Sequence, residues 1–156
     1  MNRKETTKFL SELVEKLINP TEDSRIYWAR EVTFDHATSH RVRVDYMKFE
    51  PVNNSVSGIE KGDFYCYEVK SSVEDFHSPN GHNFLGDFNY YVMPQQVYDT
   101  VRTEIPYGIG VYCPDETGLH SVRNARRRSR ERPVSEMLLM MFRSLLRDTQ
   151  KEKENE

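Results

Sequence analysis

Hydrophobic side chains recur with helical spacing near both ends of the chain. The first such face is formed by Phe9, Leu10, Leu13, Val14, Leu17 and Ile18, and Pro20 ends the pattern. We therefore predict an amphipathic helix over about residues 4–18. A last helix over about 134–147 is predicted because one face carries Val134, Met137, Leu138, Met141, Phe142 and Leu145.

Between these two helices the pattern is mainly that of short β-strands. Alternating or β-branched and aromatic runs predict strands at 26–34, 41–49, 64–72, 88–93, 107–113 and 119–122. Ser72 precedes Asp75 by three residues, which favours a short helical turn, and apolar positions repeat with helical spacing over 95–105. This order predicts an α/β fold in which a mixed central sheet is flanked by helices.

Length and composition indicate one domain. The chain has 156 residues, of which 37% are hydrophobic and 30% charged, a globular composition. We expect a domain over 1–147 and a disordered tail over 148–156, where the charges are mixed. No apolar run or N-terminal hydrophobic segment indicates a membrane span or signal peptide, so we expect a cytoplasmic protein. Cys66 and Cys113 lack metal or redox spacing and are expected to be buried free thiols.

Three residues on the second and third strands have the chemistry of a magnesium site. Residues two apart on a strand share a face, so Glu68 and Lys70 point the same way, and a hairpin register can bring Asp45 opposite Glu68. Mg²⁺, or Mn²⁺ in its place, is held by one or two carboxylates together with water and phosphate oxygens. Asp45, Glu68 and the carbonyl of Val69 are therefore candidate metal ligands. Lys70 is a candidate for orienting water and balancing charge on a phosphate.

Asp45 followed by Glu68-Val69-Lys70 resembles the metal-binding signature of the PD-(D/E)XK nuclease superfamily. The expected order of helix, three strands, helix and strand is similar to its core, and the runs EVKSSVEDF and FNYYVMP resemble MmcB-like DNA repair proteins and restriction-type nucleases. The resemblance implies a restriction-endonuclease-like core over about 4–113 with a C-terminal helical extension. It further implies a metal-dependent endonuclease that hydrolyses DNA in repair, restriction or a mobile element. Val44 stands where the signature has proline.

Other interpretations of these residues remain open. Glu68 and Lys70 also suit exposed cross-strand ion pairs with Arg41, Arg43 or Asp45. The superfamily often adds an acid from its first helix, but Glu12 and Glu15 fall opposite the stripe of Phe9, Leu13 and Leu17, which favours solvated surface. Glu31 is another candidate acid. A noncatalytic nucleic-acid-binding or assembly module on the same fold is the alternative function.

An arginine-rich segment is the other candidate for contact with nucleic acid. The net charge of −3 gives no overall attraction to nucleic acid, but residues 123–132 read RNARRRSRER. Arginine pairs well with phosphate. The candidate DNA-binding residues are Arg123, Arg126, Arg127, Arg128 and Arg130. A solvated linker or a docking site for an acidic partner is the alternative. The methionine-rich last helix suits the core or a homodimer surface, and His77 and His82 suit a surface loop.

Overall fold

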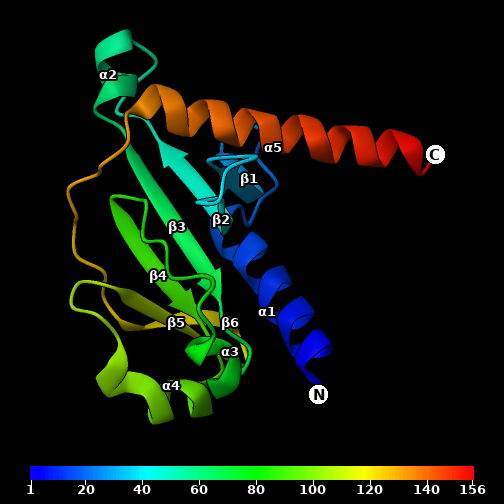
Figure 1. Ribbon diagram of the computed structural model, residues 1–156, viewed down its shortest axis with the longest axis vertical. Coiled ribbons are helices and arrows are strands. Elements are labelled where there is room, and N and C mark those ends of the chain that lie inside the picture. The colour runs from blue at the N-terminus through cyan, green and yellow to red at the C-terminus, as the bar shows by residue number, and fades with distance from the viewer.

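The computed structural model describes all residues from 1 to 156 and has one six-stranded sheet with helices packed on it (Figure 1). This confirms the predicted α/β fold with a mixed central sheet. The elements in chain order are α1 (Arg3–Ile18), β1 (Tyr27–Phe34), β2 (Val42–Glu50), α2 (Val56–Glu60), β3 (Asp63–Val69), α3 (Val73–His77), β4 (Phe88–Val92), α4 (Gln95–Val101), η1 (Arg102–Glu104), β5 (Gly110–Asp115), β6 (Gly118–Arg123) and α5 (Val134–Glu154).

The strands follow one another across the sheet in sequence order, from β1 at one edge to β6 at the other. β1, β2 and β3 pair antiparallel, β3, β4 and β5 pair parallel, and β6 returns antiparallel to β5. The parallel pairs arise because helical connections carry the chain back over the sheet between β3 and β4 and between β4 and β5. The order of helix, three strands, helix and strand is observed, with the short α2 added before β3.

Helices cover both faces of the sheet. Leu10, Val14 and Ile18 of α1 pack on one face, and Met137 and Met141 of α5 pack on the other, over β1, β2 and β3. A third cluster joins α3 and α4 to β4 and β5. Alternate residues of β3 thus serve different clusters, as the strand period requires.

The last helix is longer than the sequence pattern suggested. α5 runs from Val134 to Glu154, so residues 148–154, expected to be a disordered tail, are helical. Lys and Glu have good helix propensity, and Lys151 and Lys153 lie in the last turn, where cations interact favourably with the helix dipole. Although α1 and α5 pack on different faces, Figure 1 shows that the N-terminal end of α1 and the C-terminal end of α5 both extend beyond the sheet to the right of the view.

Two further features concern the expected thiols and membrane segments. Cys66 and Cys113 are buried and free, as predicted. None of the helices combines the length and the apolar character needed to cross a membrane.

The arginine-rich segment forms a strap, residues 124–133, between β6 and α5. Arg130 forms an ion pair of 2.7 Å with Asp87, and its guanidinium lies 5.3 Å from the ring centre of Phe64. Arg127 pairs with Asp63, and Arg132 lies 2.8 Å from Asp35. The strap is therefore held to the domain by ion pairs, because arginine can contact a carboxylate and an aromatic ring together.

Candidate active site

The second and third strands separate at the predicted acidic residues. β2 and β3 pair from Glu50↔Asp63 to Tyr46↔Tyr67, and the next pair in this register is Asp45 with Glu68. There the backbone N–H of Val69 donates to Oδ2 of Asp45 at 2.8 Å instead of continuing the ladder. The side chain of Asp45 thus satisfies a backbone donor at the point where the strands diverge.

An unusual backbone conformation lies directly across from Asp45 on β1. The β1–β2 register pairs Arg30↔Tyr46 and Val32↔Val44, which places Glu31 opposite Asp45. Glu31 has φ 50°, in the left-handed region that a side chain with a Cβ rarely adopts. Its carbonyl oxygen accepts a hydrogen bond of 2.8 Å from Nη1 of Arg147 on α5. Contacts from α5 therefore support this bend.

The bend changes which side chains of β1 and β2 enter the core. Ala29 and Val32 both join the cluster under α5 although they are three residues apart, and so do Val44 and Met47. A regular strand would send such residues to opposite faces. The change of face falls at Glu31 and Asp45, which leave the core and line a cleft instead. The bend therefore positions Asp45 on that cleft.

Glu68 is a buried carboxyl with an unsatisfied oxygen. Only 3% of its surface is exposed, and Oε2 is buried without a hydrogen-bond partner. Its other oxygen is 3.5 Å from Nδ2 of Asn83. Burial raises the pKa of Glu68 well above its ordinary range, and the neighbouring Asp45 charge raises it further. Burial also raises the pKa of Asp45, against the lowering effect of the Val69 N–H.

Lys70 follows on the same side of β3 and is enclosed by a loop. It is 3% exposed, and Nζ donates to the carbonyl of Asn80 at 2.5 Å. Gly81 has φ 76°, and a Cβ there would lie 2.6 Å from Nζ of Lys70. Glycine suits this position, because a side chain would be strained at this φ and its Cβ would displace the ammonium group of Lys70. The loop from Ser78 to Asn83 thus closes over the lysine.

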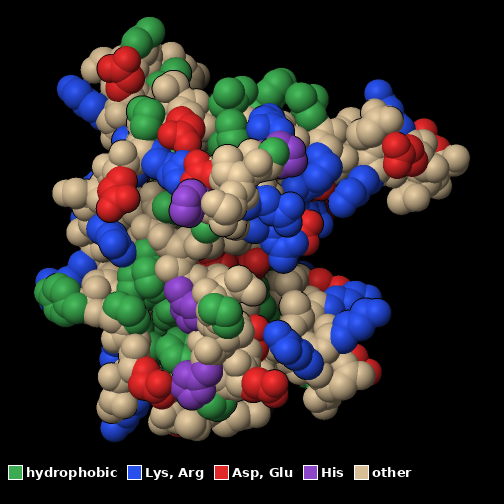
Figure 2. Space-filling view, viewed as in Figure 1, with side chains coloured by type: hydrophobic (Ala, Val, Ile, Leu, Met, Phe, Trp, Pro, Cys, Tyr) green, Lys and Arg blue, Asp and Glu red, His purple; other side chains and the backbone are tan.

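The point at Asp45 and Glu68 where β2 and β3 separate is called the fork. The fork opens into a large polar cleft. Its volume is about 1180 Å³, and only 3 of its 24 lining residues are hydrophobic. α1, the β1–β2 hairpin, the loop after α3 and the end of α5 contribute to its walls. Figure 2 shows Lys and Arg side chains on both sides of the hollow between α5 and α1. The basic residues lining the cleft are Arg3, Lys8, Arg30, Arg41, Arg43, Lys70 and Lys151.

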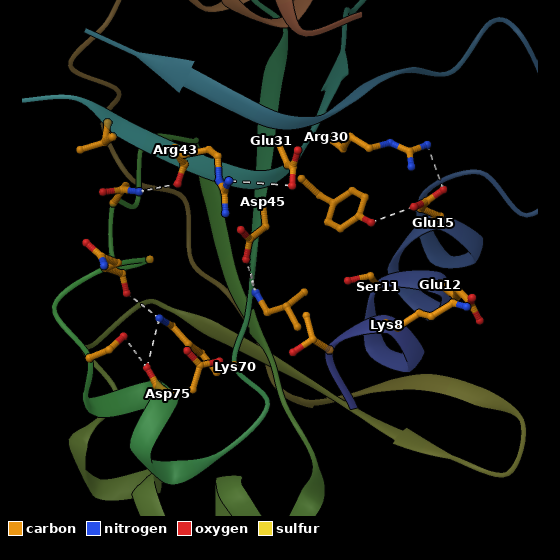
Figure 3. Close-up of a pocket in the computed structure, with 18 of the residues that line it drawn as sticks. Lys8, Ser11, Glu12, Glu15, Arg30, Glu31, Arg43, Asp45, Lys70 and Asp75 are labelled. Carbon is orange, nitrogen blue, oxygen red and sulfur yellow. Dashed lines mark hydrogen bonds and ion pairs between the residues drawn. The ribbon is translucent and has the colours of Figure 1, made fainter. Parts of the chain in front are cut away.

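Figure 3 shows Asp45 near the middle of this cleft, with Arg43 beside it on β2 and α1 on the opposite wall. The three predicted catalytic residues therefore gather at one place: Asp45 and Lys70 line the cleft, as does Val69, while Glu68 lies buried behind them. The alternative of exposed cross-strand ion pairs does not hold for Glu68 and Lys70, because both are buried. Arg43 instead lies 3.9 Å from Glu31.

Glu12 and Glu15 also line the cleft; Glu12 is exposed, as the helical pattern predicted, whereas Glu15 is half-buried. Oε2 of Glu15 accepts a hydrogen bond of 2.7 Å from the hydroxyl of Tyr46, and Arg30 donates to Oε1 at 3.3 Å. The buried stripe of α1 consists of Leu10, Val14 and Ile18, whereas the expectation for Glu12 and Glu15 took Phe9, Leu13 and Leu17 as its centre. The observed stripe is offset from the expected one by one residue, or about 100° around the helix axis. This offset brings Glu15 to the edge of the buried face.

The strap does not join this site. None of the residues from Arg123 to Arg132 lines the cleft, and Arg130 packs on Phe64, four residues before Glu68 and thus about 13 Å away along β3. Arg126 and Arg128 are exposed, whereas Arg123 donates to the carbonyl of Arg102 at 3.1 Å. Apart from Lys70, the basic residues of the cleft were not predicted from the sequence to bind a ligand. The alternation of Arg41, Arg43 and Asp45 was a signal that they share one face.

His77 and His82, which were predicted from the sequence to lie on a surface loop, each contact another residue of the domain. Nδ1 of His82 is 2.7 Å from the hydroxyl of Tyr91 and Nε2 is 2.8 Å from the carbonyl of Ser78. His77 lies 2.9 Å from Glu104. No group of three or more His, Cys, Asp or Glu side chains is arranged to hold a metal ion. A cation at the fork would therefore depend on two carboxylates, a backbone carbonyl, water and substrate.

Comparisons with known proteins bear on the fold. No protein-family model matches the chain. No curated protein matches it either. Among solved structures, the chain is similar to the SPO1766 protein of unknown function from Silicibacter pomeroyi, with a TM-score of 0.59 and 18% sequence identity. The match covers 82% of this chain and 80% of that chain. At this identity the similarity concerns the fold alone.

Proposed function

We propose that the cleft hydrolyses phosphodiester bonds of DNA with the help of a divalent cation at the Asp45–Glu68 fork. The observation that carries the proposal is the buried, unpaired oxygen of Glu68 beside a second carboxyl group. Two such groups repel when both are ionised, and a cation between them would remove that repulsion. A purely structural carboxylate is normally satisfied by donors when it is buried.

The donor set fits Mg²⁺ or Mn²⁺. Hard cations of this kind take oxygen ligands and commonly use one or two carboxylates while keeping several waters. Asp45 and Glu68 would hold the ion, together with the carbonyl of Val69, which also lines the cleft. When bound, such an ion polarises a phosphate oxygen and lowers the pKa of water.

The residues of the chain supply positioning and charge. Arg43 of β2 and Arg41, which directly precedes β2, line the cleft together with Asp45, and Arg3 and Lys8 stand on the α1 wall. Each is suited to a phosphate of the backbone, and phosphate contacts position nucleic acid without reading its sequence. Lys70, released from Asn80, would face the phosphate and stabilise the negative charge that develops on it.

One observation favours the noncatalytic alternative. The ammonium group of Lys70 is held by the carbonyl of Asn80, so the loop must move before this lysine reaches a substrate. A nucleic-acid-binding module would need no such movement. The two functions differ in whether the chain cuts DNA when a divalent cation is present.

The test is a cleavage panel on duplex, single-stranded and branched DNA and on RNA, with Mg²⁺, Mn²⁺ or chelator. The parent protein and Glu68→Gln are compared, and calorimetry measures the binding of each ion. Metal-dependent cleavage by the parent alone supports the proposal. Binding of DNA without cleavage under every condition supports the noncatalytic module, and equal cleavage by Glu68→Gln refutes the assignment of the site.

A further inference from the structure

The outer side of α5 is an apolar surface without a partner inside the domain. Leu139, Phe142, Leu145 and Leu146 expose between 46% and 56% of their surface. Leu139, Phe142 and Leu146 follow the spacing that makes one ridge along a helix. Figure 2 shows hydrophobic side chains gathered along this side of α5. Soluble domains normally keep such side chains apart, so a continuous ridge indicates a contact surface.

A groove runs beside this ridge. Its volume is about 680 Å³, and 10 of its 17 lining residues are hydrophobic. Phe142 and Leu145 of α5 form one wall, and Tyr27, Phe49 and Ile59 contribute to the floor and the other wall. Ridge and groove are therefore next to each other on one face of the molecule.

We propose that a second copy of this chain docks here, with the α5 ridge of each protomer against the groove of the other. A two-fold dimer requires one patch to be complementary to itself, and a ridge beside a groove meets that requirement. Ile26 and Tyr27, which line the groove, add exposed apolar surface beside the ridge. The four α5 side chains together with Ile26 and Tyr27 expose roughly 500 Å². A typical interface buries about 800 Å² per partner, of which about 60% is apolar. The exposed apolar area therefore matches what one protomer contributes to such an interface.

The dimer would place two clefts close together. Asp148 and Glu152 of α5 line both the apolar groove and the polar cleft, so the two hollows meet at the same helical segment. An interface along α5 therefore sets one cleft next to that of the partner. This consequence rests on the proposed function: two neighbouring sites suit the two strands of a duplex. The dimer itself does not depend on catalysis.

Sedimentation equilibrium of the full chain tests the proposal. The parent is expected to show twice the monomer mass at about 10 µM, whereas Phe142→Glu should weaken association by at least about 30-fold. Leu146→Glu, also exposed, provides a second disruption. Tyr107→Glu is the matched control, because Tyr107 is 85% exposed and lines neither hollow. Circular dichroism checks that each variant is folded.

The outcomes separate this inference from the proposed function. A parent that stays monomeric up to about 100 µM, or dimerisation that survives in both folded α5 variants, overturns the dimer. If the control Tyr107→Glu loses dimerisation together with the α5 variants, the assignment of the interface to α5 is overturned. A dimer that lacks metal-dependent cleavage would overturn the proposed function and leave the α5 interface standing.

Discussion

Two buried carboxylates, one at the strap and one at the fork, differ in how they are satisfied. Asp87 accepts the backbone N–H of Phe64 at 2.8 Å and pairs with Arg130 at 2.7 Å. Glu68, equally buried, has an unpartnered oxygen and another carboxyl group as its neighbour. The first arrangement holds the chain together, whereas the second is unfavourable in the protein alone. The difference separates an acid used for stability from one available to a ligand.

The largest expected effect concerns activity at the fork. Glu68→Gln and Asp45→Asn should each reduce metal-dependent cleavage by about 1000-fold or more, because the cation loses a charged ligand. The folded state should survive, since each change keeps the size of the side chain and removes a buried ionisable carboxyl group. Cleavage assays and thermal unfolding on the same preparations measure both effects. Asp87→Asn, at a temperature where it is folded, is the control and should retain cleavage.

The next effect concerns stability at the strap. Asp87→Ala leaves the guanidinium of Arg130 and the N–H of Phe64 without their partner, and should lower the free energy of unfolding by about 3–5 kcal/mol. Urea unfolding measures this loss. A loss below about 1 kcal/mol would show that the strap ion pair behaves like an exposed one.

A smaller effect is expected in the dependence of stability on pH. The raised pKa of Glu68 means that the folded chain keeps a proton which the unfolded chain releases. Below the ordinary Glu pKa both states are protonated. As pH rises above it, the free energy of unfolding should fall, by up to about 1.4 kcal/mol per pH unit, until the raised pKa is reached. Unfolding in chelator should show this slope, and Glu68→Gln or added Mg²⁺ should reduce it. An unchanged slope in Glu68→Gln would assign it to other groups.

The backbone bend at Glu31 should respond to glycine. Glu31→Gly adopts φ 50° without a Cβ clash, so it should be more stable than Glu31→Ala by about 1 kcal/mol. Both variants lack the carboxylate, which makes them a matched pair for the backbone alone. Thermal unfolding measures the difference. The reverse order of stability would mean that the left-handed conformation is not strained.

The smallest effect concerns salt dependence. Arg41→Ala with Arg43→Ala should reduce the slope of log affinity against log salt by about 0.9 per lost phosphate contact on duplex DNA. Arg126→Ala with Arg128→Ala removes two exposed arginines of the strap and should leave the slope unchanged. Fluorescence anisotropy in chelator measures both. The opposite result would restore the sequence-based prediction that the arginine-rich segment binds the DNA.

The sequence by itself determined the order of the elements, apart from the short α2, and the shared face of Glu68 and Lys70, because strand and helix periods are local properties of the chain. It also predicted the pairing that brings Asp45 opposite Glu68, since that register follows from two neighbouring strands. Tertiary structure decided the rest. The side of α1 that packs on the sheet set the place of Glu15, and acids distant in sequence turned the expected arginine arm into a strap. The bend at Glu31 depends on Arg147 from the last helix, a contact between segments 116 residues apart that no local pattern contains.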